Sequence, residues 1–454
     1  MSAGFLDQLE QRHAEGNPIR VGIIGAGKFG GGLMAQLSQM KGMEASAVAD
    51  LDTGRARQMH AACGTSEEAL ATVNSAAQAS DAIRAGKRVI SQDALAVIGC
   101  DLVDVVVDAT GVPEAGARNG VAAIEHGKHL VMVNVETDVT VGSILRRKAD
   151  RAGVVYTLVD GDQPGCTVQM VDWAKTLGFE IVAAGRGTEY FADDRSGTPD
   201  SVKERFQFDD ETMSRRSINL KMYNSFRDGT KAQLEMTALA NMTGLPPDVR
   251  GMHEPSANLA DIPRLFSVKE EGGLLSRPGV VELANSVADD GQTMLPDPLR
   301  MGVFVVIRTD HPFTREDLTS YHCHVGGEGG NFLLYRPYHL VAVEAPMSIA
   351  AAVLQGTATG APLERPVADV VAVAKRDLKQ GETLDAGGGY TVNGVIEKAE
   401  IATAENLLPL GLSAGAKLKR GVLAGEAIPY DAVTLNEESF VLQLRREQDR
   451  MAAP

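Results

Sequence analysis

Hydrophobic positions in the first third of the chain gather in short, nearly continuous runs, each followed by a turn and a helical pattern. These runs read IRVGII, ASAVAD, DLVDVVVDA, HLVMVNV and VVYTLVD. Apolar strands that alternate with helices are typical of a parallel sheet covered by helices on both faces. We therefore predict an α/β domain over residues 1–160.

The first run leads into Gly25-x-Gly27-x-x-Gly30, and the second run ends at Asp50, 20 residues beyond Gly30. In such a strand–turn–helix unit the first glycine permits the tight turn and the second lets a pyrophosphate approach the backbone. The third lets the helix pack on the strand. Spacing and context together predict a Rossmann-type dinucleotide site.

Contacts to the cofactor are expected from this turn and from the carboxyl ends of the later strands, where ligands of parallel sheets collect. The candidates are Gly25, Gly27, Lys28, Phe29, Gly30, Asp50, Arg55, Thr110, Gly111, Asn134 and Glu136. Asp50 favours NAD, because it can accept hydrogen bonds from a ribose. Arg55 and Arg57 favour NADP, because they could hold its 2′-phosphate. The choice between the two cofactors stays open.

The pattern changes after residue 160 to long polar loops with scattered strands, among them MGVFVVIRTD and NFLLYRPYHLVAVEAP. A buried helix, MSIAAAVLQG, is expected to return the chain toward the first domain. We predict an α+β catalytic domain over residues 161–365. The remaining residues have short strands, repeated glycines and little helical period, so a small β-rich domain is predicted over 366–454.

The helix predicted over residues 230–243 carries only two ionisable side chains, Lys231 and Glu235. Asp228 is placed to cap its N-terminus. Its apolar stripe consists of Ala232, Met236, Leu239, Ala240 and Thr243, and its polar row of Gln233, Thr237 and Asn241. A helix with so little charge is expected to be largely buried.

Two interpretations of the Lys231–Glu235 pair compete. One is a structural i, i+4 salt bridge. The other is a cleft wall, where Lys231 polarises or protonates an oxygen and Glu235 sets its pKa. Buried ion pairs stabilise a fold poorly, because desolvation can exceed the Coulombic gain, and this favours the functional interpretation.

Composition narrows the class of protein. The chain has 454 residues, enough for two or three domains, and its net charge of −16 argues against a general nucleic-acid binder. The N-terminal residues are polar, so no signal peptide is expected. No run of about 18 apolar residues occurs, so no membrane span is expected. The four cysteines show no disulfide or metal spacing, which fits a reducing compartment. We expect a cytoplasmic protein.

Three further groups are interpreted as structural. Basic residues of the tail are expected to be a solvated surface: Lys375, Arg376, Lys417, Lys419 and Arg420. His322 and His324 lack a third ligand at a metal spacing, so an ordinary loop or strand end is favoured. Cys166 has no paired histidine and is expected to be a packed thiol.

Six stretches together resemble the DXR-like (DRL) enzymes: VNVETDVTVG, YTLVDGDQPG, GRGTEY, KMYNSFRDGTKAQLEM, ANMTGL and YRPYHL. In the tail, AKRDLKQGETL and KRGVLAGEAIPYDAV resemble the clip segments of a SAF domain. The likeness extends over essentially the whole chain. It implies a homoserine-dehydrogenase-like NADPH domain and a homodimer. The implied reaction converts 1-deoxy-D-xylulose 5-phosphate, a small phosphorylated sugar, to 2-C-methyl-D-erythritol 4-phosphate for isoprenoid synthesis in the MEP pathway.

The reaction implied by this resemblance needs a phosphate anchor, an electrophile for carbonyl oxygens and an acid–base group. Arg336 and His339 suit the anchor, with Asn224 and Gln163 as further substrate contacts. The catalytic candidates are Lys231, Glu235, Asp228, Lys221 and Asp162. Conventional reductoisomerases and homoserine dehydrogenases place a lysine where this chain has Val135. The catalytic cation is therefore expected from Lys231 or Lys221.

A divalent metal, Mg²⁺ or Mn²⁺, could serve as a Lewis acid, with Asp162, Glu136 and Glu189 as oxygen ligands. No spacing in the sequence demands it. Two other functions stay open. One is a homoserine-dehydrogenase-like or sugar/polyol-derivative dehydrogenase on the same scaffold, and the other is a nucleotide-sensing or carbohydrate-binding protein without turnover.

Overall fold

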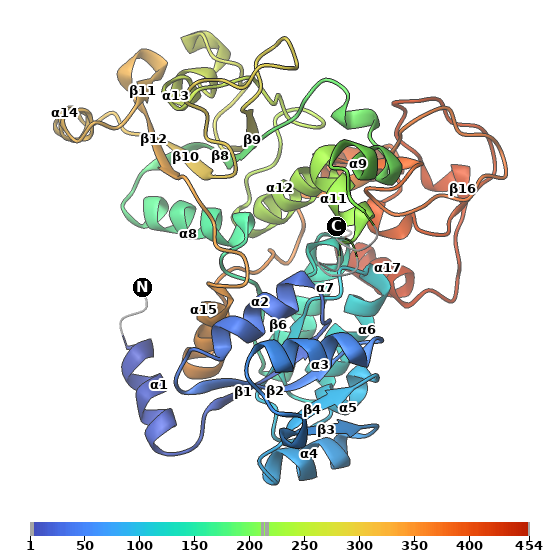
Figure 1. Cartoon of the computed structure of the whole chain (residues 1–454). Coiled ribbons are helices and arrows are strands. Elements are labelled where there is room, and N and C mark those ends of the chain that lie inside the picture. Colours follow the sequence, from blue (N-terminus) through green and yellow to red (C-terminus); the bar gives the residue numbers. More distant parts are fainter. Residues whose placement is uncertain (1–3, 210–212, 214–217, 453–454) are drawn as a thin grey trace. The chain divides into compact units, whose positions relative to one another are not determined.

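The computed structural model describes residues 4–209, 213 and 218–452. Contacts group the chain into two compact units (Figure 1). Unit 1 comprises Met1–Asp162, Leu340–Glu364 and Ser439–Pro454, and unit 2 comprises Gln163–His339 and Arg365–Glu438. This grouping differs from the three domains expected from the sequence, because the strands of the tail fall in unit 2 and its last helix in unit 1.

Unit 1 is built on a parallel seven-stranded sheet in the order β3-β4-β2-β1-β5-β6-β7. Its strands are β1 (Ile19–Ile24), β2 (Met43–Ala49), β3 (Leu70–Val73), β4 (Arg88–Ser91), β5 (Val105–Asp108), β6 (His129–Met132) and β7 (Tyr156–Leu158). The inner strands are almost wholly buried, as their Val/Ile/Leu content requires. The predicted Rossmann-type domain is confirmed.

Nine helices of the described part of unit 1 accompany this sheet. They are α1 (Phe5–Ala14), α2 (Lys28–Leu37), α3 (Thr53–Ala62), α4 (Ala76–Arg84), α5 (Ala94–Ile98), α6 (Pro113–Glu125), α7 (Val135–Ala152), α15 (Ala345–Ala350) and α17 (Phe440–Ala452). The helix predicted to return to the first domain is α15, and Ala345 and Ile349 lie in the same hydrophobic core as Ile23 and Leu33.

The last helix, α17, corrects the prediction that residues 366–454 form one β-rich domain. Its residues Val441, Leu442 and Leu444 are buried, and it packs on α6 and α7. Its N-terminus is held by the carboxylate of Glu114, which accepts from the Phe440 amide at 3.0 Å and the Val441 amide at 2.9 Å. These partners lie more than 300 residues away along the chain, so local periodicity gave no sign of them.

Unit 2 contains a five-stranded mixed sheet in the order β11-β12-β10-β8-β9. Its strands are β8 (Glu180–Thr188), β9 (Val280–Asn285), β10 (Val303–Arg308), β11 (Val325–Gly326) and β12 (Asn331–Arg336). β10 runs antiparallel to both β8 and β12, and β9 runs parallel to β8. Phe266 and Phe304 stack in the core beside this sheet.

The tail adds two short hairpins to unit 2. They are formed by β13 (Ala368–Ala374) with β14 (Val392–Lys398) and by β15 (Lys417–Leu418) with β16 (Val433–Thr434). In the described part of unit 2, the helices are α8 (Gln163–Thr176), α9 (Pro199–Arg205), α11 (Leu220–Arg227), α12 (Thr230–Thr243), α13 (Ile262–Leu265), α14 (Pro312–Ser320) and α16 (Ala399–Ala404). The α/β class and a small β-rich tail are thus confirmed.

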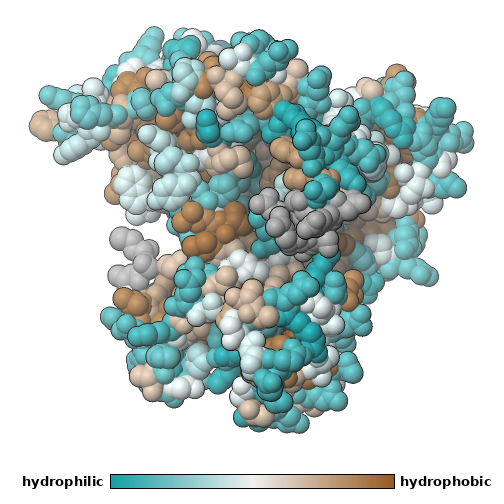
Figure 2. All heavy atoms as spheres, viewed as in Figure 1, coloured by the Kyte–Doolittle hydropathy of each residue, from teal (hydrophilic) through white to brown (hydrophobic). Residues whose placement is uncertain are grey.

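The surface is polar over most of the face drawn in Figure 2, as expected for a chain with a net charge of −16. Among the residues that the structure describes, no helix is both long and apolar enough to cross a membrane.

Helix α12 is buried on all its sides: every residue from Thr230 to Met242 is buried. One side packs on α8 and on strands β8 and β9, and the other packs on β13 and β14 of the tail. This explains the near absence of charge that the sequence shows, since a helix enclosed in this way has very little surface in water.

The polar row of α12 faces the tail. The side chain of Gln233 accepts from the Ile396 amide at 2.8 Å, and the hydroxyl of Thr230 accepts from the Gly394 amide at 3.1 Å. Asn241 accepts from the Ala368 amide at 3.0 Å and donates to the carbonyl of the same residue at 3.1 Å. The row therefore supplies partners for strand backbone that would otherwise be buried without hydrogen bonds.

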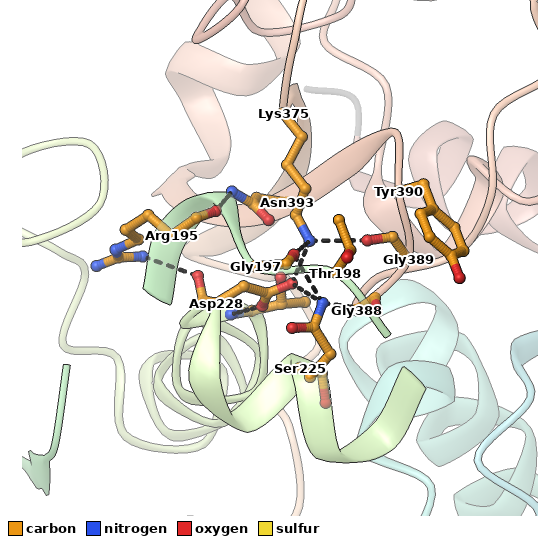
Figure 3. A network of polar contacts seen from close by, with 12 residues as sticks. Arg195, Gly197, Thr198, Ser225, Asp228, Lys375, Gly388, Gly389, Tyr390 and Asn393 are labelled. Carbon is orange, nitrogen blue, oxygen red and sulfur yellow. Dashed lines mark hydrogen bonds and ion pairs between the residues drawn. The ribbon is translucent and has the colours of Figure 1, made fainter. Parts of the chain in front are cut away.

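The N-terminus of α12 is fixed by a second contact to the tail (Figure 3). The ammonium of Lys375 lies 2.7 Å from a carboxylate oxygen of Asp228, and it also donates to the carbonyls of Gly197 at 2.7 Å and Gly389 at 2.8 Å. Asp228 accepts from the Thr230 amide at 2.9 Å, although Gly229 occupies the cap position predicted for Asp228. The expectation that Lys375 is a solvated surface charge is wrong, because its side chain is buried.

Replacing Lys375 by methionine should destabilise unit 2 by about 3–5 kcal/mol, because it leaves the Asp228 carboxylate buried without its cation. Burial already raises the pKa of Asp228, and Lys375 opposes that rise. Urea unfolding of the full chain measures the effect. Lys417→Met, at an exposed lysine of the same tail, is the matched control, and Asp228→Asn in the Lys375→Met background should recover part of the loss. A Lys375→Met variant as stable as the control would contradict this role.

Candidate functional site

The glycine turn of unit 1 has the geometry that a dinucleotide needs. Gly25 has φ +107°, and a Cβ there would lie 2.8 Å from the carbonyl oxygen of Ala109. A Cβ on Gly30 would lie 2.2 Å from the oxygen of Gly25, so this glycine permits the close approach of α2 to the turn. A Cβ on Gly27 would meet nothing within 4 Å. The space at Gly27, at an α2 N-terminus without a side-chain cap, fits a pyrophosphate.

Asp50 at the end of β2 is oriented by this turn. One carboxylate oxygen accepts from the Ala26 amide at 2.6 Å, and the other accepts from the Asp52 amide at 2.8 Å. A carboxylate can accept about four hydrogen bonds, so capacity remains for ribose hydroxyls. Arg57 is bound by Glu67 and Thr72, whereas Arg55 is half-exposed and lies 3.4 Å from Asp52. Of the two arginines considered for a 2′-phosphate, Arg55 is the better placed to turn toward one.

A buried polar cluster connects the ends of β5 and β6. Thr110 donates to Asp108 at 2.8 Å, and Asn134 donates to the Thr110 hydroxyl at 3.0 Å while it caps α7 through the Thr137 amide. Burial raises the pKa of Asp108. The structure thus brings Thr110 and Asn134 together, and Gly111 follows with φ +66°.

The remaining cofactor candidates lie on the same elements. Lys28 is exposed and Phe29 half-buried in the first turn of α2, and Glu136 lies in the first turn of α7.

In unit 2, two arginines share one row of the five-stranded sheet. Val303 on β10 is paired with Arg186 on β8 and with Arg336 on β12. Residues paired directly across neighbouring strands project from the same face, and strands lie about 4.8 Å apart. Arg186 and Arg336 therefore project from one face, two strands apart.

Both arginines reach the first turn of α8. Arg186 donates to the amide oxygen of Gln163 at 3.0 Å, and Arg336 donates to the Cys166 sulfur at 3.4 Å. The planar guanidinium of Arg336 also stacks on the Tyr338 ring, 4.6 Å from its centroid. Gln163 and Arg336, both predicted as substrate contacts, are brought together around one helix turn. Cys166 is buried, as expected.

Arg186 forms a buried ion pair with Glu235 of α12, and their side chains are 4% and 1% exposed. Glu235 is predicted from the sequence as a site residue, but its partner Arg186 is not. A charged residue in the middle of the otherwise apolar strand EIVAAGRGT was the available signal. Lys231, which is 8% exposed, precedes Glu235 by one helical turn and so lies on the same side of α12.

Two hollows open beside this row of arginines. A small one of about 160 Å³ is lined by Arg186, Glu189, Tyr190, Arg227, Ala232 and others, and burial lowers the pKa of Arg227. A larger one of about 610 Å³ is lined by Arg336 and Cys166 together with residues of α8 and of the loop before β11.

Four further residues predicted for the site, Asn224, Lys221, His339 and Asp228, have other surroundings. Asn224 donates to the carbonyls of Gly197 and Gly388 at 2.9 Å each and belongs to the Lys375–Asp228 network. Lys221 is exposed on α11, and His339 lies 3.0 Å from the Met301 carbonyl. Figure 3 shows Asp228 within that network.

The three proposed metal ligands are divided between the units. Asp162 and Glu136 belong to unit 1, and Glu189 belongs to unit 2. A metal bound by this set stays a prediction.

Two family models match the chain. Residues 25–158 match the homoserine dehydrogenase NAD-binding domain, and residues 161–345 match the catalytic domain of oxidoreductase DRL. The first range contains the glycine turn and Asp50, and the second contains Arg186, Glu235 and Arg336. The chain is an NAD(P)-dependent oxidoreductase. No curated protein matches it.

Solved structures similar to this oxidoreductase are distant. An oxidoreductase from Agrobacterium radiobacter in complex with NAD+, L-tartaric acid and magnesium is 16% identical, with a TM-score of 0.28. That alignment covers 38% of this chain and 44% of the other, so it spans less than half of that protein's length. A putative myo-inositol dehydrogenase from Sinorhizobium meliloti 1021 is 14% identical over 75% of this chain and 90% of the other, with a TM-score of 0.38.

A structure of DOX-P reductoisomerase in complex with magnesium is 15% identical over 48% of this chain and 56% of the other, with a TM-score of 0.31. Scores this low carry no argument about the substrate of this oxidoreductase.

Substitutions in the glycine turn can separate an effect on cofactor affinity from an effect on stability. Gly27→Val should leave the melting temperature nearly unchanged, because the structure has space for a side chain there, but should weaken NAD(P)H binding at least about tenfold by filling the pyrophosphate space. Gly30→Val, the control, should lower the melting temperature as well, since its side chain meets the oxygen of Gly25. NAD(P)H fluorescence and thermal unfolding measure both. Undiminished affinity in Gly27→Val would show that the cofactor does not use this turn.

Proposed function

We propose that this oxidoreductase transfers a hydride between a nicotinamide cofactor and a carbonyl or hydroxyl carbon of a small, anionic sugar or polyol derivative. The observation that supports this substrate class is the row of Arg186 and Arg336, together with the buried Lys231 one helical turn before Glu235, which binds Arg186.

Each side chain of the row has a distinct role in the proposal. Arg336 presents a fork of donors that suits carboxylate or phosphate oxygens, and its stacking on Tyr338 restricts its plane. Arg186 is held by Glu235 and Gln163, so it orients the wall of the site.

Lys231 is assigned to the reacting oxygen. A buried ammonium can donate a hydrogen bond to a carbonyl oxygen in reduction and a proton to the alkoxide that forms. When bound, the nicotinamide supplies or accepts the hydride. The glycine turn and Asp50 would hold its dinucleotide.

A second candidate is the reductoisomerase that the sequence resemblance implies, with 1-deoxy-D-xylulose 5-phosphate as substrate and NADPH as reductant. The match of residues 161–345 to the catalytic domain of oxidoreductase DRL favours it. In this candidate, Lys231 would stabilise the enolate oxygen during the carbon–carbon rearrangement, before reduction of the new aldehyde. A metal, a homodimer and a cytoplasmic location belong to this proposal.

The absorbance of the reduced nicotinamide distinguishes these candidates. The purified chain is assayed in both directions with NAD(H) and NADP(H), with and without Mg²⁺ or Mn²⁺. The substrates are 1-deoxy-D-xylulose 5-phosphate, homoserine, and a panel of phosphorylated or carboxylated sugars and polyols. Turnover of an anionic sugar or polyol other than 1-deoxy-D-xylulose 5-phosphate supports the proposal, and turnover of 1-deoxy-D-xylulose 5-phosphate supports the second candidate. Turnover of homoserine alone, or of none of them, would overturn it.

Lys231→Met should lower kcat by about 10²–10³, because a preorganised donor to a developing oxyanion contributes about 2.7–4 kcal/mol. Lys221→Met, at the exposed lysine that was the alternative cation, should change kcat little. Kinetics of the folded variants with a substrate found in the panel, together with melting temperatures, check both. A nearly normal kcat for Lys231→Met would leave Lys231 with a structural role only.

A further inference from the structure

Helix α7 is kinked, and a side chain of helix α17 lies at the kink. Val141 has φ −141° and ψ 15°, outside the helical range. A regular helix would join the Thr140 carbonyl to the Ile144 amide, four positions later. Here the Ile144 amide donates to the side-chain oxygen of Gln448 at 3.0 Å, and the side-chain nitrogen of Gln448 donates to the Thr140 carbonyl at 3.2 Å. Gln448 therefore bridges the kink.

The surroundings of Gln448 specify this bent geometry. Its side chain is buried, and its amide binds one backbone donor and one backbone acceptor of α7. A side chain that enters the i→i−4 ladder of a helix is an established cause of kinks. Gly142 lies within the kink, where a Cβ would come 2.3 Å from a carboxylate oxygen of Asp138. The bend thus depends on Gln448 and on the missing side chain of Gly142.

The half of α7 before the kink begins at the predicted cofactor site. Asn134 caps it by accepting from the Thr137 amide at 3.1 Å, and it donates to the Thr110 hydroxyl at 3.0 Å and the Val112 carbonyl at 3.1 Å. Thr110 and Asn134 follow β5 and β6. A Rossmann-type sheet has two mononucleotide-binding halves, and the glycine turn belongs to the adenosine half. The ends of β5 and β6 therefore belong to the nicotinamide half.

The half of α7 after the kink is anchored elsewhere in unit 1. The hydroxyl of Ser143 donates to the Leu363 carbonyl at 2.7 Å, and Arg146 donates to the Pro362 carbonyl at 2.5 Å. Helix α17 also packs on α6, whose first turn supplies Glu114 as its cap. α17 therefore contacts both helices that leave the ends of β5 and β6 (Figure 1).

We propose that Gln448 is a positioning residue for the nicotinamide half of the cofactor site. It sets the direction of the first half of α7 and thereby the place of Asn134 and of the Thr110 hydroxyl that Asn134 binds. The proposal rests on the proposed function in respect of its nicotinamide cofactor, not of its substrate. It adds that α17, more than 300 residues from α7 along the chain, supports one half of the cofactor site and not the other.

Replacing Gln448 by methionine removes both hydrogen bonds, and the flexible methionine side chain can fill the same space. The variant should raise the Kd of NAD(P)H at least about fivefold. The Kd of ADP, which lacks the nicotinamide and its ribose, should stay within about twofold of the parent value. NAD(P)H is titrated by its fluorescence and ADP by displacement of NAD(P)H. Hydrogen exchange of the Ile144 amide should become faster, because that amide loses its acceptor.

Two other variants of α17 serve as controls. Leu444→Ala removes buried packing of the same helix and should lower the melting temperature. It should not change the ratio between the affinities for NAD(P)H and ADP. Gln443→Met makes the same replacement at an exposed glutamine of α17, and it should change neither the melting temperature nor the affinities.

Four results would overturn the inference: an Ile144 amide that exchanges as in the parent, unchanged NAD(P)H affinity in Gln448→Met, an equal loss of affinity for NAD(P)H and ADP, or the same selective loss in Leu444→Ala. The titrations need no substrate. If NAD(P)H binds but no substrate of the panel is turned over, the proposed function alone is refuted. If hydride transfer is found but the loss in Gln448→Met is not selective, the role of Gln448 alone is refuted.

Discussion

The enclosure of helix α12 is the constraint on which unit 2 depends. A helix with no face in water must satisfy each polar side chain with protein, since an unpaired buried group costs about 1–3 kcal/mol. α12 meets this requirement with two different neighbours. Gln233 and Asn241 of its polar row are bound to the backbone of the tail, and Glu235 is bound to Arg186 of the inner strand β8.

This arrangement makes the tail part of unit 2. Lys375 of the tail fixes Asp228 before α12, and β14 is hydrogen-bonded to Thr230 and Gln233. Because Lys231 lies between those two residues, its position follows from the docking of the tail as well as from the sheet. The role proposed for Lys231, a cation placed precisely at a reacting oxygen, requires such support from a second layer of contacts.

Much of this organisation could be predicted from the sequence. The glycine turn, Asp50 and the parallel sheet could be predicted from local signals. These signals are the spacing of the glycines and the apolar runs that alternate with helical patterns, and each of them lies within a short stretch of the sequence. The burial of α12 also followed from its own composition. Its partners did not, because Arg186, Lys375 and Ile396 are far away along the chain and local periodicity does not report which buried surfaces meet.

Two errors have the same origin. Lys375 was interpreted as a solvated charge, although it donates to three acceptors, two of which, Gly197 and Asp228, belong to distant segments. Helix α17 was assigned to a β-rich tail, although Glu114 of α6 caps it. The candidate site was predicted in part: Gln163, Glu235 and Arg336 were named from the sequence, but the cross-strand row that places Arg186 beside them requires the register of the sheet.

Native-state hydrogen exchange tests the enclosure of α12 most directly. If the helix is held between the two sheets of one unit, its amides should exchange only through the opening that also exposes β8 and β14. Their opening free energies should then agree within about 1 kcal/mol. The contrary result is a separate opening that exposes the amides of α12 and β14 together, with an opening free energy several kcal/mol below that of β8. It would show that the tail is an independent domain and would contradict the enclosure of α12.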